Sequence, residues 1–247
     1  MLAVYALAAA AYVLLPGGMA ANASLMGMPM PDVPLWQLAA ANVLLIVVVY
    51  GVMAFAGDAL ARRSGLPGAL PAEVSPRALW LEPLAIGAGA GVGLVAIDRV
   101  TALVAPRFGG FPHPAFPSSV LASLTAGIGE EIAFRLFVLS LWAWLLTGLA
   151  RWLGRPALRP AALGAANALA ALAFAAGHLG SATLLAGVTT PLALPPAELV
   201  ELLVLNGALG LLAGRAFLRH GLLAASGVHF WADVVWHVLF PVLLGGA

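Results

Sequence analysis

The amino-acid sequence predicts an all-α fold, a polytopic transmembrane helix bundle of about seven helices, with eight as the alternative. Hydrophobic residues make up 63% of the 247 residues and charged residues only 9%, against roughly a quarter charged in soluble domains. So few polar groups could not cover the surface of a soluble protein of this size. Backbone polar groups in lipid must be satisfied internally, which membrane-spanning helices achieve.

Seven apolar segments are candidates for these helices, because a span needs about 20 apolar residues. The segments are Leu2–Ala20, Leu35–Ala56, Leu79–Val104, Ser118–Leu153, Ala161–Leu185, Pro196–Phe217 and Leu222–Leu244. The fourth segment is unusual, since its length would make a helix of about 54 Å, too long for one straight span and short for two. We expect a single transmembrane domain over residues 1–247.

Arginines predict how the segments cross the membrane. All eleven basic residues are arginine, and clusters follow the second, fourth and sixth segments: Arg62, Arg63 and Arg77; Arg151, Arg155 and Arg159; Arg215 and Arg219. The positive-inside rule then places the amino terminus in the cytoplasm and the carboxyl terminus outside. Arg99 and Arg107 fall on the opposite face. We expect an integral protein of the cytoplasmic membrane, in contact with the lipid bilayer.

Composition excludes several kinds of chemistry. The chain has no cysteine, so disulfides, thiolate nucleophiles and Cys-ligated metal sites are ruled out. The net charge of +1 suggests no nucleic-acid partner. Glycines spaced four apart inside the third and sixth segments predict close helix packing. They are Gly87, Gly89, Gly91, Gly93, Gly210 and Gly214.

Three charged residues lie inside the fourth segment, where charges are costly. Glu130, Glu131 and Arg135 are flanked by apolar sequence, and unpaired they would cost about 8–10 kcal/mol on insertion scales. Glu131 and Arg135 are one helical turn apart and can pair. Glu130 has no partner on its own helix face, and a spare carboxylate in apolar surroundings is a natural general base. The alternative is a buried ion-pair network that only fixes helix packing.

Histidines occur at a similar depth in two other segments. His178 ends an alanine-rich stretch, while His229 and Asp233 lie one turn apart in the last segment. A single intramembrane histidine usually serves packing or hydrogen bonding. Histidines on separate helices beside a spare glutamate favour a catalytic site. We expect His113 and His220, in or near loops, to be ordinary surface residues.

These residues resemble the motifs of a family of intramembrane proteases. Glu130-Glu131-xxx-Arg135 is similar to its EExxxR motif, Phe174-xxx-His178 to its FxxxH motif, and His229-xxx-Asp233 to its last motif. The family is the CAAX-prenyl-protease and bacteriocin-processing (CPBP) group, which includes the Rce1-like CAAX prenyl protease 2 and Abi proteins. The motifs occur in the family's order, and the resemblance implies a catalytic core over residues 118–238.

The resemblance implies an intramembrane endopeptidase that hydrolyses peptide bonds of membrane-associated or lipidated substrates in a cavity within the membrane. Its substrate would be a peptide or a membrane protein, prenylated or not. Glu130 and His178 would activate a water, and His229 with Asp233 would stabilise the oxyanion. Supporting residues would be Glu131, Arg135 and Phe174. No cofactor is expected.

One position departs from the family pattern, which usually has asparagine where this chain has Asp233. A protonated Asp233 could donate a hydrogen bond as asparagine does, or the oxyanion role could be lost. We favour a third role, in which Asp233 accepts the ring proton of His229 and so orients it.

Two other functions stay open at this stage. Glu130, His178 and His229 could bind zinc as two histidines and a carboxylate, which would make a zinc-dependent intramembrane metalloprotease. The chain could instead be a non-proteolytic membrane scaffold or immunity-type protein on the same fold. A water-accessible cavity that reaches Glu130 would favour the enzyme, and a dry packed interior the scaffold.

Overall fold

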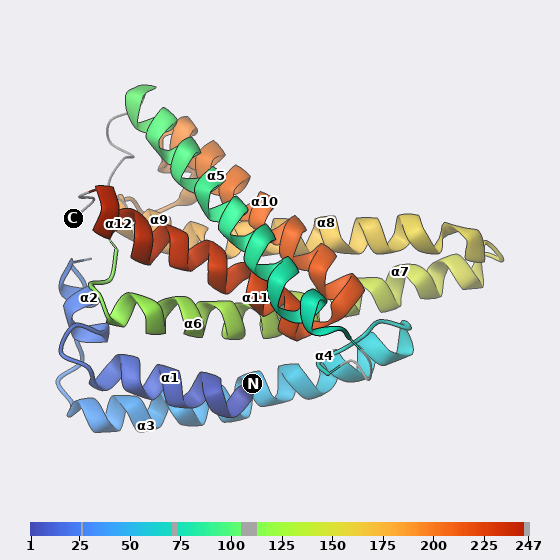
Figure 1. Cartoon of the computed structure of the whole chain (residues 1–247), viewed down its shortest axis with the longest axis horizontal. Coiled ribbons are helices and arrows are strands. Elements are labelled where there is room, and N and C mark those ends of the chain that lie inside the picture. Colours follow the sequence, from blue (N-terminus) through green and yellow to red (C-terminus); the bar gives the residue numbers. More distant parts are fainter. Residues whose placement is uncertain (26, 71–73, 105–112, 245–247) are drawn as a thin grey trace.

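The computed structural model describes residues 1–25, 27–70, 74–104 and 113–244, and within these ranges all regular elements are helices (Figure 1). The amino-terminal half contains α1 (Leu2–Leu14), α2 (Met19–Leu25), α3 (Leu35–Leu45), η1 (Ile46–Tyr50), α4 (Gly51–Arg63), η2 (Arg77–Leu81) and α5 (Glu82–Val104). The rest contains α6 (Ser118–Glu131), η3 (Ile132–Leu139), α7 (Ser140–Trp152), η4 (Pro156–Leu158), α8 (Arg159–Gly177), α9 (Leu179–Leu185), η5 (Pro191–Ala193), α10 (Pro196–His220), α11 (Leu222–Asp233), η6 (Val234–Leu239) and α12 (Phe240–Leu244).

The predicted membrane bundle is confirmed. Several of these elements join end to end, and six continuous helices in the described ranges are long and apolar enough to cross a bilayer. They are Leu35–Arg63, Arg77–Val104, Ser118–Trp152, Pro156–Leu185, Pro196–His220 and Leu222–Leu243. Together with the shorter apolar helix α1 they correspond to the seven predicted segments. The protein is therefore an integral membrane protein.

The first helix is shorter than predicted. We expected one helix over Leu2–Ala20, but α1 has 13 residues and ends at Leu14, a length of about 20 Å. Leu15 has extended backbone angles, φ −71° and ψ 139°, because the proline that follows disfavours the helical conformation of the residue before it. The chain then turns at Gly17 and Gly18 and continues as the short helix α2.

The long fourth segment is a single helix that runs through the middle of the bundle. It is continuous over 35 residues from Ser118 to Trp152, through α6, η3 and α7. Its first part packs against α1 and α11, its middle against α4 and α8, and its last part against α8 (Figure 1). The middle part, η3, is wound with the wider π-type turns that often mark functional sites.

Glycines allow two close helix contacts, as the sequence predicted. A methyl group at Gly87 or Gly91 of α5 would collide with the α11–η6 helix, and one at Gly214 of α10 would collide with Asn167 of α8. Gly210, on the same face of α10, lies against Ala171. The prediction was wrong for the two alternate glycines of α5, Gly89 and Gly93, because nothing lies within 4 Å of a Cβ placed there. They point away from α11.

The three arginine clusters gather at one end of the bundle. The side chain of Arg159 donates a hydrogen bond of 2.9 Å to the carbonyl of Ser64, which joins the end of α4 to the start of α8. The backbone N–H of Leu222 donates to the carbonyl of Gly68 at 3.0 Å, which brings the α10–α11 turn to the same place. The opposite end carries α2, α9 and the start of α6 (Figure 1).

Candidate active site

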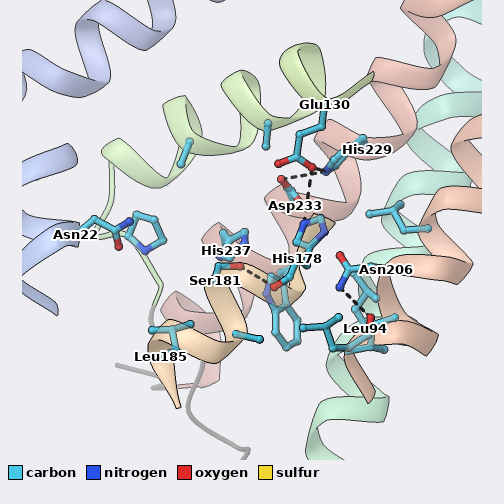
Figure 2. A pocket seen from close by; sticks show the side chains of 18 of the residues that line it. Asn22, Leu94, Glu130, His178, Ser181, Leu185, Asn206, His229, Asp233 and His237 are labelled. Atoms are coloured by element: carbon cyan, nitrogen blue, oxygen red, sulfur yellow. Dashed lines mark hydrogen bonds and ion pairs between the residues drawn. The ribbon is translucent and has the colours of Figure 1, made fainter. Parts of the chain in front are cut away.

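A cavity of about 430 Å³ lies inside the bundle, in the half that contains α2 and α9. Glu130 of α6, His178 at the α8–α9 junction, and His229 and Asp233 of α11 all line it (Figure 2). Its remaining wall is largely apolar, and α9 and α10 contribute more of it than any other helix. The sequence motifs, which lie on three separate helices, therefore converge on one accessible space.

Glu130 is the accessible carboxylate of the site. About a third of its side chain is exposed, 34%, whereas that of its neighbour Glu131 is fully buried. One oxygen, Oε2, lies 3.8 Å from Nε2 of His178 and 3.9 Å from Nε2 of His229. These distances are too long for direct hydrogen bonds, but a water molecule can bridge groups at such a separation. The glutamate thus faces two imidazoles from neighbouring helices, as predicted.

His178 is held in a defined orientation by its own helix. It caps the carboxyl end of α8, and its Nδ1 donates a hydrogen bond of 2.9 Å to the carbonyl oxygen of Phe174. A carbonyl can only accept, so the proton of the neutral ring lies on Nδ1. Nε2 is left with a free lone pair directed at Glu130.

His229 is surrounded by three carboxylates. Its Nδ1 donates to Oε1 of Glu131 at 2.8 Å, while its Nε2 lies 3.6 Å from Oδ2 of Asp233 and 3.9 Å from Glu130. We expected Asp233 to orient this ring, but the carboxylate in hydrogen-bond contact with it is Glu131. Because Asp233 is one turn away on the same helix, it reaches the far edge of the ring at a distance too long for a direct bond.

Glu131, Arg135 and Phe174 form a buried support beneath the two histidines. Glu131 pairs with NH1 of Arg135 at 3.1 Å, and both side chains are fully buried. The guanidinium lies over the ring of Phe174, 4.2 Å from its centre. That ring in turn contacts His178 and His229 edge to face, with centres 4.8 and 5.5 Å apart. One aromatic ring therefore fixes the spacing of both imidazoles.

Several cavity residues were missed or misread from the sequence. Tyr12 and Asn22 line the cavity from α1 and α2, and their only signal is a polar group in an apolar segment. His113 is not an ordinary surface residue: it is partly buried, and its Nδ1 lies 3.1 Å from Nδ1 of the cavity residue His237. Burial and the nearby charge of Arg99 lower the pKa of His113 to about 4.

The zinc alternative rests on the same three side chains. Among the residues that the structure describes, no group of three His, Asp or Glu side chains is arranged to hold a metal ion. A single oxygen of Glu130 faces the Nε2 atoms of both imidazoles, at 3.8 and 3.9 Å.

The fold and site together define a class: a polytopic membrane protein with a glutamate–histidine cluster in an internal cavity. A sequence profile described as type II CAAX prenyl endopeptidase, Rce1-like, matches residues 112–235. This match spans half of the chain and includes all three motifs, so the chain belongs to the Rce1-like family of membrane proteases. Searches of curated proteins and of solved structures found no match.

Proposed function

We propose that this protein is an intramembrane endopeptidase in which Glu130 and His178 activate a water for attack on a peptide bond. The observation that carries the proposal is the contrast between the adjacent glutamates. Glu130 is exposed to a cavity that also contains two imidazoles, while Glu131 is sealed into contacts with Arg135 and His229. A purely structural network would bury both.

The arrangement of Glu130 and His178 supports water activation. A water between them could donate one hydrogen to the carboxylate and the other to Nε2 of His178, since both groups accept there. Its oxygen lone pair would then point into the cavity, where a substrate carbonyl can approach. As the oxygen attacks, its proton passes to Glu130, which can deliver it to the leaving amine.

His229 is placed to stabilise the charge that develops on the carbonyl oxygen. With Nδ1 bonded to Glu131, the protonated ring can donate from Nε2 toward the cavity. A donor fixed in advance and shielded from bulk water contributes more to catalysis than one that must reorient. Asp233 lies 3.6 Å from the same Nε2, too far for a direct hydrogen bond, so its contribution to holding the ring is smaller than that of Glu131.

The cavity favours an apolar peptide segment as the substrate. Five leucines from α5, α9 and α10 line it, and His178, His229 and Asp233 gather at the glutamate (Figure 2). We propose that peptides or membrane-associated proteins, lipidated or not, present such a segment from within the cytoplasmic membrane. We further propose that no metal takes part, because Glu130 and His178 suffice to activate the water.

Glu130→Gln should abolish cleavage and leave the protein folded, because the amide keeps the shape but cannot accept a proton. The test compares new peptide termini in membranes from cells that make the wild type, Glu130→Gln or Glu201→Gln. Glu201 is a buried glutamate of α10 outside the cavity, so its variant is the matched control. Products should disappear only with Glu130→Gln.

Two outcomes would contradict this assignment. Undiminished cleavage by Glu130→Gln would remove the glutamate from the reaction, and an absence of any product in the wild type would favour the scaffold. In the same assay, a chelator such as phenanthroline should leave the wild-type products unchanged. Their loss, with recovery on adding zinc, would establish the metalloprotease instead.

A further inference from the structure

A second, smaller pocket lies at the arginine-rich end of the bundle, and none of the residues that line it also lines the cavity of Glu130. Its volume is about 150 Å³, and it lies between the start of α5 and the turn that joins α10 to α11. Arg215, Arg219 and His220 of α10 line one side, and Glu82 lines the other. None of these residues takes part in the proposed reaction.

The charges around this pocket leave two arginines unengaged. The only acid in its wall, Glu82, already faces Nε2 of His220 at 3.5 Å and Nε of Arg77 at 3.9 Å. Within the described residues, no carboxylate lies within 4.0 Å of Arg215 or Arg219. Both arginines are exposed and lie one turn apart on the same helix face. The pocket therefore has an excess of positive charge.

The other surfaces of the pocket are suited to an amphiphile. Ile86 and Leu212 line the pocket. Their side chains are 40% and 37% exposed, so they would face lipid. Ala224 in the first turn of α11 also lines it, and the amino end of a helix favours anions. A single amphiphilic ligand could thus place its charged group in the pocket and its apolar chain along Ile86 and Leu212.

We propose that this pocket binds the phosphate headgroup of an anionic membrane lipid. Arg215 and Arg219 would contact the phosphate, and an acyl chain would lie along the exposed side chains of Ile86 and Leu212. Arginine suits this task because its planar guanidinium pairs with two phosphate oxygens at once. Basic pockets between helices at the cytoplasmic face bind such headgroups, and the arginine clusters predict that this end is cytoplasmic.

Native mass spectrometry of the detergent-solubilised protein, titrated with dioleoylphosphatidylglycerol, tests the proposal. Arg215→Gln/Arg219→Gln should bind this lipid about 30-fold more weakly than the wild type, since each basic group near the surface contributes about 1 kcal/mol. The control variant Arg151→Gln/Arg155→Gln removes two exposed arginines from the same end of the bundle but outside the pocket, and should bind as the wild type does.

Further measurements distinguish specific lipid binding from simpler explanations of the loss. Arg215→Lys/Arg219→Lys keeps the charge and should retain most of the binding, which excludes misfolding as the cause of the loss. The zwitterionic dioleoylphosphatidylcholine should bind weakly to every variant. Equal binding of the two lipids, an equal loss in the control variant, or displacement of the lipid by millimolar inorganic phosphate would overturn the proposal.

Discussion

The two adjacent glutamates lie in different surroundings and therefore have different roles, although they are neighbours in the sequence. Successive residues on a helix point about 100° apart, so Glu131 turns toward Arg135 and His229 in the dry interior while Glu130 turns toward the cavity. The sequence predicted this division, because Arg135 lies four positions after Glu131 and leaves Glu130 without a partner. It did not predict that Glu131 also orients His229, since that contact joins positions 98 residues apart.

Arg135→Ala should destabilise the protein strongly, because it leaves the carboxylate of Glu131 buried without its cation. Removal of one partner from a buried pair costs about 3–5 kcal/mol. The melting temperature in detergent should therefore fall by roughly 10 °C. Arg151→Ala, which removes an exposed arginine from the same helix, is the control and should melt as the wild type does. An unchanged melting temperature for Arg135→Ala would mean that the pair is not needed for stability.

Asp233→Asn should keep most of its activity. The amide has the same shape as the carboxylate, and the 3.6 Å separation from His229 leaves no strong bond to lose. We expect cleavage within about tenfold of the wild-type rate, the range of a single neutral hydrogen bond. The measurement is the initial rate of product formation for a substrate found by the terminus comparison. An inactive variant would show that the carboxylate itself is required.

Helix positions follow closely from the sequence, whereas breaks within helices do not. The lengths of the apolar segments predicted the positions of all six long helices, because backbone polar groups in lipid must form their hydrogen bonds within helices. The short interruption at His178 between α8 and α9, within the long helix Pro156–Leu185, has no proline; only the flanking glycines Gly177 and Gly180 mark it in the sequence, yet it sets where Nε2 points. The early end of α1 did carry such a signal in Pro16, which the predicted segment Leu2–Ala20 passed over.

The contact between α5 and α11 gives a paired test of glycine packing. Gly91→Ala should destabilise the protein by about 1–3 kcal/mol, because its methyl would lie 2.6 Å from Cβ of Val235 and 2.7 Å from the carbonyl of Ala232. Gly93→Ala lies on the open side of the same helix and should be neutral or stabilising by up to about 1 kcal/mol. Thermal melts of both variants measure the difference, and a loss of stability in Gly93→Ala equal to that in Gly91→Ala would contradict the packing role.

At the scale of the whole molecule, the motifs predicted which residues meet but not the walls around them. Glu130, His178 and His229 lie on helices that the sequence could order but not place in space. Tyr12 and Asn22 join the cavity only because α2 folds back near the start of α6. Contacts between distant segments of this kind depend on side-chain packing, which periodicity does not encode.

The arrangement of charges over the molecule predicts its orientation in the membrane. Eight of the eleven arginines lie at one end, and the cavity lies in the half toward the other end, where Ser181 lines it and is exposed. We therefore expect the cavity to be reached from the non-cytoplasmic side.

The chain has no cysteine, so single-cysteine variants can test this orientation directly. An impermeant maleimide added to intact cells should label Ser181→Cys and Thr189→Cys. It should label Arg155→Cys only after the membrane has been opened. The reverse pattern would invert the predicted orientation but would leave the proposed chemistry untouched.

The pairing of Glu131 with Arg135 on a single helix has a consequence for biogenesis. Because this helix precedes α8 and α11 in the chain, we expect it to enter the bilayer before they do. Two opposite charges one turn apart can neutralise each other at that moment, without help from later segments. Glu130 meets the histidines only when those later helices are in place, so the proposed catalytic site would assemble only once translation is nearly complete.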